Sequence, residues 1–132
     1  MSKMENRPIA VIVTGAGAPG IQGTLYSLKQ NYDNRSFHVI GTDINDFVVG
    51  KYLCDEFCVI SPAKKEEEYL SDLMSICKDR NVKAILPQKT AELLLLAKHK
   101  KMFSDIVVGI VVSNYDAIEK ANNKYKLFQI AE

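Results

Sequence analysis

Residues 8–20 read Pro-Ile-Ala-Val-Ile-Val-Thr-Gly-Ala-Gly-Ala-Pro-Gly, and this stretch decides the fold. The unbroken apolar run at 8–13 is rich in β-branched residues, which is typical of a strand buried on both faces of a parallel sheet. Gly15, Gly17 and Gly20 follow directly with the spacing G-x-G-x-x-G, and apolar residues then recur at helical spacing. The stretch therefore predicts a buried first strand, a glycine-rich turn and a first helix.

The remaining chain continues the alternation of strands and helices. Short apolar runs predict further strands at 37–43, 56–60, 82–86 and 106–112, and helical periodicity predicts helices from 21 to 31–34, from about 70 to 80, from 90 to 102 and from 113 to 120. Short connections between alternating strands and helices imply right-handed βαβ units. We therefore expect an α/β fold, a Rossmann-like doubly wound parallel sheet of about five strands in three α/β/α layers.

Composition excludes several classes of partner. The 132 residues are 47% hydrophobic and 25% charged, as in ordinary globular domains, and the net charge of +1 gives no general attraction to nucleic acid or anionic lipid. No apolar stretch approaches the length of a membrane helix, and the N-terminus has no export signal. Three cysteines without a pattern of zinc ligands suggest reduced thiols. We therefore expect a cytoplasmic protein with no metal site of its own.

The glycine-rich turn has two interpretations. Gly15 would form the tight turn, Gly17 would allow a ligand or another backbone to approach, and Gly20 or Gly23 would let the helix pack on the strand. The turn then either binds an anion at the start of the helix or simply connects two elements, and Pro19 removes one amide from an anion site. Asp43, at the end of the second strand, would either hold ribose hydroxyls or cap a loop.

Five segments in this order, each weak alone, resemble the N-terminal pre-ATP-grasp domain of ATP-grasp ligases, in particular the large subunit of carbamoyl-phosphate synthase and its relatives. They span nearly the whole chain: Val-Ile-Val-Thr-Gly-Ala-Gly at 11–17, Gly-Thr-Asp at 41–43, Tyr-Leu-Cys-Asp-Glu-Phe at 52–57, Ala-Ile-Leu-Pro at 84–87 followed by Glu92, and Asn-Lys-Tyr-Lys at 123–126.

The resemblance implies a domain at 1–121 and, at 122–132, the start of a linker helix toward an ATP-grasp domain on the same chain or on a separate subunit. That second domain would bind ATP and Mg²⁺ and activate bicarbonate or a carboxylate as an acyl phosphate, whereas this chain alone would be inactive and would bind neither tightly. Lys124 would reach an ATP phosphate, although Asn123 replaces the usual Asp. Glu92 would face a small-molecule substrate, and two copies would pair through helices.

An NAD(P)-binding domain of a short-chain or epimerase-like oxidoreductase is the alternative. The glycine-rich turn and Asp43 fit it, but the chain lacks the Tyr-x-x-x-Lys pair that such reductases need, because Tyr125 and Lys126 are adjacent and diverge on a helix. A non-catalytic binding module or split subunit is a third interpretation that the residues leave open.

Overall fold

The computed structural model describes residues 8–17, 21–29 and 36–111. Its centre is a five-stranded, all-parallel sheet with the strand order β3-β2-β1-β4-β5. The strands are β1 (Ile9–Thr14), β2 (Phe37–Asp43), β3 (Glu56–Val59), β4 (Ala84–Leu86) and β5 (Gly109–Ile110). The helices are α1 (Ile21–Lys29), α2 (Glu66–Asp79), α3 (Thr90–Lys98) and α4 (Lys100–Ser104), with a short 3-10 helix η2 (Val49–Tyr52) between β2 and β3.

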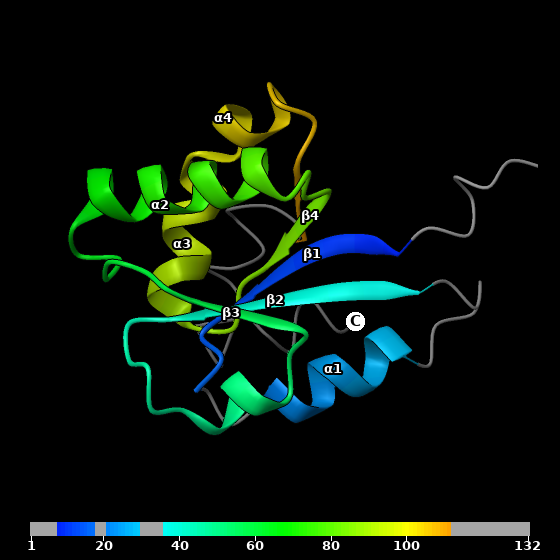
Figure 1. Cartoon of the computed structure of the whole chain (residues 1–132). Coiled ribbons are helices and arrows are strands. Elements are labelled where there is room, and N and C mark those ends of the chain that lie inside the picture. Colours follow the sequence, from blue (N-terminus) through cyan, green and yellow to red (C-terminus); the bar gives the residue numbers. More distant parts are fainter. Residues whose placement is uncertain (1–7, 18–20, 30–35, 112–132) are drawn as a thin grey trace, which may run out of the picture.

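Helices cover both faces of the sheet, with α1 on one face and α2, α3 and α4 on the other (Figure 1). Side chains of β1 alternate between the two cores: Ile12 packs under α2 and α3, whereas Val11 and Val13 pack with Ile21 and Leu25 of α1. The predicted three-layer doubly wound fold is therefore confirmed, and β1 is buried on both faces as its apolar run indicates. None of the helices in the described part of the chain is long and apolar enough to span a membrane.

The region between α3 and β5 differs from the predicted pattern. The single helix predicted over 90–102 is broken at His99, and α4 then runs to Ser104. The backbone amides of residues 106–108 bond to Phe103 and Ser104, and Val107 adopts a left-handed φ of 62°. Because Phe103 is fully buried, this apolar run completes the end of α4 and leaves only Gly109–Ile110 for the strand.

Smaller differences occur at other element ends. β4 begins at Ala84 rather than at Val82, because the amide of Val82 bonds to the carbonyl of Cys77 and closes the end of α2. β3 ends one residue earlier than predicted, at Val59. The predicted end of the first helix near 31–34, the helix predicted at 113–120 and the linker helix predicted at 122–132 lie outside the described residues.

Candidate functional site

The carboxyl ends of the parallel strands meet at one edge of the sheet, which is where doubly wound folds bind ligands. The glycine-rich turn follows β1 there, Asp43 ends β2, the segment 60–64 follows β3, and Lys89 precedes α3. This edge therefore gathers side chains from four segments that are far apart in the sequence, and it is our candidate functional site.

The glycine-rich turn requires glycine at two positions. Gly15 has a φ of 63°, a conformation that favours glycine, and a β-carbon there would lie 3.0 Å from Cγ of Lys89. At Gly17 a β-carbon would lie 2.8 Å from Cγ1 of Val48 and 3.1 Å from Oδ2 of Asp43. At both positions, other parts of this chain occupy the space that glycine leaves.

Asp43 is buried and uses both carboxylate oxygens within the fold. Its Oδ2 accepts a hydrogen bond from the amide of Gly17 at 2.8 Å, and its Oδ1 accepts one from the amide of Asn45 at 3.1 Å. Nζ of Lys89 lies 3.8 Å from Oδ2. Asp43 was predicted either to hold ribose hydroxyls or to cap a loop. The geometry favours the loop cap, because one carboxylate oxygen is already bonded to the amide of Gly17 and the other to the amide of Asn45.

The segment 48–54, which contains η2, packs on the glycine-rich turn. A β-carbon at Gly50 would overlap the carbonyl oxygen of Ala16 and lie 2.7 Å from its carbonyl carbon. A β-carbon at Gly41 would lie 2.6 Å from Sγ of Cys54. At Gly17, Val48 of this segment lies in the space that an added β-carbon would need.

A buried acid lies at the base of the site. Glu92 of α3 is 7% exposed, and the hydroxyl of Tyr69 donates a hydrogen bond of 2.6 Å to its Oε2. Burial raises the pKa of Glu92, although the hydrogen bond from Tyr69 and the hydroxyl of Thr14 at the end of β1 act to lower it. Burial, and the adjacent carboxyl of Glu92, raise the pKa of Tyr69 well above its ordinary range, so its hydroxyl stays a donor.

These groups border a cavity of about 310 Å³. Its walls come from the ends of β2 and β3, from Tyr69 of α2 and from the beginning of α3. The lining residues are Asp43, Ile44, Ile60, Ser61, Pro62, Ala63, Lys64, Tyr69, Lys89, Ala91 and Glu92. The structure thus places Glu92 and Asp43 on the wall of one cavity, and the role of Glu92 toward a substrate stays a prediction.

Other predicted site residues lie elsewhere or outside the description. Gly15 and Gly17 are at this edge, whereas Gly20 and Lys124 lie outside the described residues. Cys77 is buried on the apolar side of α2, as its helical spacing indicates. Across residues 8–17, 21–29 and 36–111, no group of three or more His, Cys, Asp or Glu side chains is arranged to hold a metal ion.

Sequence reasoning missed Tyr69 and Lys64 as members of the site. Tyr69 lies four residues before Leu73 on α2, so its helical spacing indicates burial, but its partner Glu92 belongs to another helix. Lys64 precedes α2 among charged residues that are mostly exposed. Only the folded arrangement places both at the cavity.

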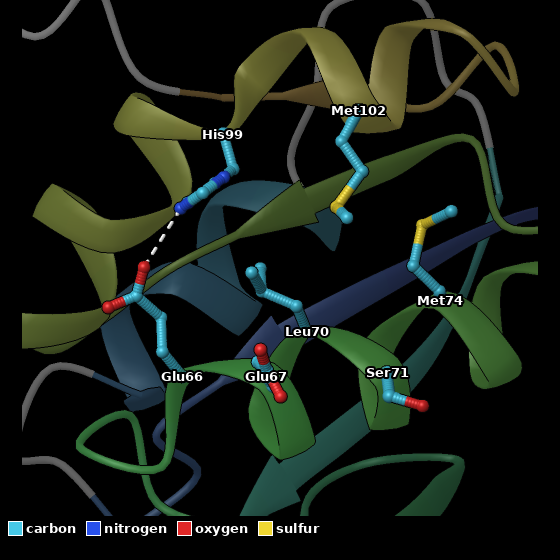
Figure 2. Close-up of a pocket in the computed structure, with 7 residues that line it drawn as sticks. All are labelled: Glu66, Glu67, Leu70, Ser71, Met74, His99 and Met102. Atoms are coloured by element: carbon cyan, nitrogen blue, oxygen red, sulfur yellow. Dashed lines mark hydrogen bonds and ion pairs between the residues drawn. The ribbon is translucent and has the colours of Figure 1, made fainter.

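A second hollow of about 600 Å³ lies on the outer side of α2, between this helix and the α3–α4 junction (Figure 2). Its lining residues are Glu66, Glu67, Leu70, Ser71, Met74, His99 and Met102. Nε2 of His99 lies 3.0 Å from Oε1 of Glu66, and this contact connects α3 to the start of α2. The hollow contains none of the residues of the candidate site.

Fold and site together define a doubly wound α/β domain in which residues 48–54 pack on the described part of the glycine-rich turn, at the carboxyl edge of the sheet. The family model described as "PylC-like, N-terminal domain" matches residues 11–112, and the chain belongs to this family. A comparison with curated protein sequences gives no match.

Solved structures share the fold. The biotin carboxylase subunit of a pyruvate carboxylase aligns with a TM-score of 0.56 and 14% identity over 94% of this chain. The biotin carboxylase domain of a thermophilic 2-oxoglutarate carboxylase, a structure with ADP bound, aligns with a TM-score of 0.58 and 13% identity over 92%. A complete pyruvate carboxylase from Rhizobium etli aligns with a TM-score of 0.55 and 16% identity over 95%.

This chain covers only 27%, 26% and 13% of those three structures, so it corresponds to one part of much longer proteins. The family and these folds confirm the predicted resemblance to the N-terminal domain of ATP-grasp proteins. The comparisons thus support an ATP-grasp ligase in general, without a particular type of ligase.

Proposed function

We propose that this chain is the N-terminal domain of an ATP-dependent ligase of the ATP-grasp kind. The observation that carries the proposal is the family match over residues 11–112, an N-terminal domain that by its family name is followed by more protein. Residues 1–121 would form the domain, and residues 122–132 would begin the connection to an ATP-grasp domain on the same chain or on a second one.

In the finer form of this proposal, the ligase is of the carbamoyl-phosphate-synthase-like type. A carboxylate or bicarbonate oxygen attacks the γ-phosphorus of ATP, ADP leaves, and an acyl phosphate forms. An amine nitrogen then attacks the acyl carbon, phosphate leaves, and the nitrogen loses a proton. Such transfer needs metal ions and cationic groups around the phosphoryl oxygens.

The residues of this chain would serve the substrate side of that reaction. The residues around the cavity beside Glu92 would form one wall of the active-site cleft between this domain and the ATP-grasp domain. Asp43 would hold the glycine-rich turn in place. ATP and Mg²⁺ would be held mainly by the ATP-grasp domain, because the described residues offer no metal cluster. Lys124 would add a positive charge near an ATP phosphate, and the domain alone would be inactive.

The test uses the protein in which this domain occurs together with an ATP-grasp domain, as one chain or as a complex. Phosphate release is measured with Mg-ATP, candidate acids labelled with ¹⁸O in the carboxylate, and ammonia or amines. The expected result is acid-dependent release of phosphate that carries one ¹⁸O atom, which is the signature of an acyl phosphate. Absence of such release with every acid, or micromolar binding of NAD to the 132-residue chain, would contradict the proposal.

A further inference from the structure

We propose that the 310 Å³ cavity at the carboxyl edge binds a small aliphatic carboxylic acid, with its carboxylate at Lys64 and Lys89 and its hydrocarbon part against the apolar wall. This inference rests on the proposed function, because the bound acid would be the substrate that the ligase activates. It goes further by placing that substrate on named residues and by favouring an organic acid over bicarbonate.

The acids of the cavity have little capacity left for a ligand. Both oxygens of Asp43 accept amide hydrogen bonds, from Gly17 and Asn45. The carboxyl of Glu92 already accepts a hydrogen bond from the hydroxyl of Tyr69. A ligand that brought only hydrogen-bond donors, such as an amine, would therefore compete with bonds that the fold has already made.

The cations of the cavity have donors to spare. A lysine ammonium carries three N–H donors. Within the described part of the chain, Lys64 has no ion pair or hydrogen bond, and the contact of Lys89 with Asp43 is long, at 3.8 Å. Lys89 is also 45% exposed, so its ammonium can reach a bound group. The hydrogen-bonding groups that remain unused in the cavity are therefore N–H donors, and an anion can accept hydrogen bonds from them.

The apolar lining of the cavity favours an anion that has a hydrocarbon part. Ile44, Ile60, Pro62, Ala63 and Ala91 line it with hydrocarbon. Covering apolar surface stabilises an aliphatic group in proportion to the buried area, a gain that bicarbonate and inorganic phosphate do not have. A volume of about 310 Å³ is at the lower end for small-molecule sites, which fits an acid of a few carbons.

The buried bottom of the cavity, where Glu92 and Tyr69 lie, is compatible with a bound anion. Burial raises the pKa of Glu92, so its carboxyl opposes a nearby anion less than an ordinary ionised acid would. Tyr69 keeps the carboxyl in place through its hydrogen bond of 2.6 Å. The charge of the bound acid would stay at the lysines, and its apolar part would lie nearer to Glu92.

The experiment titrates the ¹⁵N-labelled 132-residue chain with pentanoate, pentylamine, bicarbonate and inorganic phosphate, followed by amide NMR shifts. Pentanoate is expected to give saturable shifts at residues 44, 60, 61, 63, 64 and 89–92, and to bind at least tenfold more tightly than the other three probes. Replacing both lysines, Lys64→Met with Lys89→Met, is expected to weaken pentanoate about tenfold. Lys83→Met is the matched control, because Lys83 is exposed and precedes β4 at the opposite edge of the sheet.

A charge-neutral variant tests the apolar wall separately. Ala91→Leu fills the cavity on the exposed side of α3 and is expected to weaken pentanoate while the NMR spectrum stays that of a folded chain. Pentylamine binding in place of pentanoate, equal binding of phosphate or bicarbonate, or no binding of any probe would each overturn the inference. Loss of ¹⁸O transfer in the ligase assay despite pentanoate binding would instead count against the proposed function alone.

Discussion

Gly50 packs directly on the carbonyl group of Ala16, so that a β-carbon at residue 50 would overlap the carbonyl oxygen. Because the obstacle is backbone, no side-chain rotation relieves it. Gly50→Ala is therefore expected to lower the free energy of unfolding by about 1–3 kcal/mol, the usual cost of overpacking, and to loosen the glycine-rich turn. Urea unfolding followed by circular dichroism measures the first effect, and amide exchange at Ala16 and Gly17 measures the second.

Gly23→Ala is the matched control. Gly23 lies on an exposed position of α1, and a β-carbon there would meet nothing within 4 Å. Because alanine is the better helix former, this substitution is expected to stabilise the chain by about 1 kcal/mol. Equal effects of the two substitutions would show that η2 does not pack on the turn as described.

The glycine-rich turn illustrates what could be predicted from the sequence. Its spacing and its position between a buried strand and a helix are local, so the strand–turn–helix unit and the parallel sheet were predicted correctly. The cover formed by residues 48–54 could not be predicted, because it depends on packing between segments that only the folded sheet brings together. Gly41 and Gly50 only weakly indicate this packing, since each glycine leaves room for a close neighbour.

The candidate site was predictable to a similar extent. Asp43 was predicted because it ends a strand at the carboxyl edge of the sheet, and Glu92 was predicted through the family resemblance. Tyr69 was not, because its role depends on a hydrogen bond between two helices that are separated by a strand. The strand predicted at 106–112 exists, but its extent was overestimated, since burial of Phe103 decides where α4 ends and local β-propensity does not.

Asp43→Ala is expected to remove the two hydrogen bonds that hold the turn after β1 to the turn after β2. A hydrogen bond to a charged group contributes about 1.5–3 kcal/mol, so the free energy of unfolding should fall by at least that amount. Amide exchange should rise specifically at Gly17 and Asn45. Asp46→Ala is the control, because its ion pair with Lys51 is exposed and should contribute little to stability.

Tyr69→Phe is expected to destabilise the chain by about 1–3 kcal/mol, because it leaves an oxygen of the buried Glu92 without its donor. In the double variant with Glu92→Gln, the two effects should not add, since both substitutions disturb one hydrogen bond. A double-mutant cycle from urea unfolding measures this coupling. Strict additivity would mean that the contact does not contribute to stability.

Glu92→Gln is expected to change stability in a pH-dependent way. Burial raises the pKa of Glu92 above its ordinary value of 4.5, so the folded chain holds this proton more tightly than the unfolded chain. The free energy of unfolding of the wild type should therefore fall as the pH rises from 4.5 to the folded-state pKa, and glutamine removes this loss. The stability of Glu92→Gln relative to wild type should rise over that window. A difference that is constant with pH would contradict the raised pKa.

Glu56 should show the opposite dependence. The carboxylate of Glu56 accepts hydrogen bonds from Nε2 of His38 at 2.7 Å and from Nε of Arg80 at 2.9 Å. These bonds connect β2, β3 and the end of α2, and both lower the pKa of Glu56 from 4.5. The unfolded chain then binds the proton more readily, so the stabilisation is fully present above pH 4.5 and is lost as the pH falls through the folded-state pKa. Glu56→Gln should therefore be destabilising at pH 6 and approach the wild type in strong acid. Arg80→Met, which removes one of the two partners, should lose only part of this pH dependence, and a full loss in that variant would show that His38 contributes nothing.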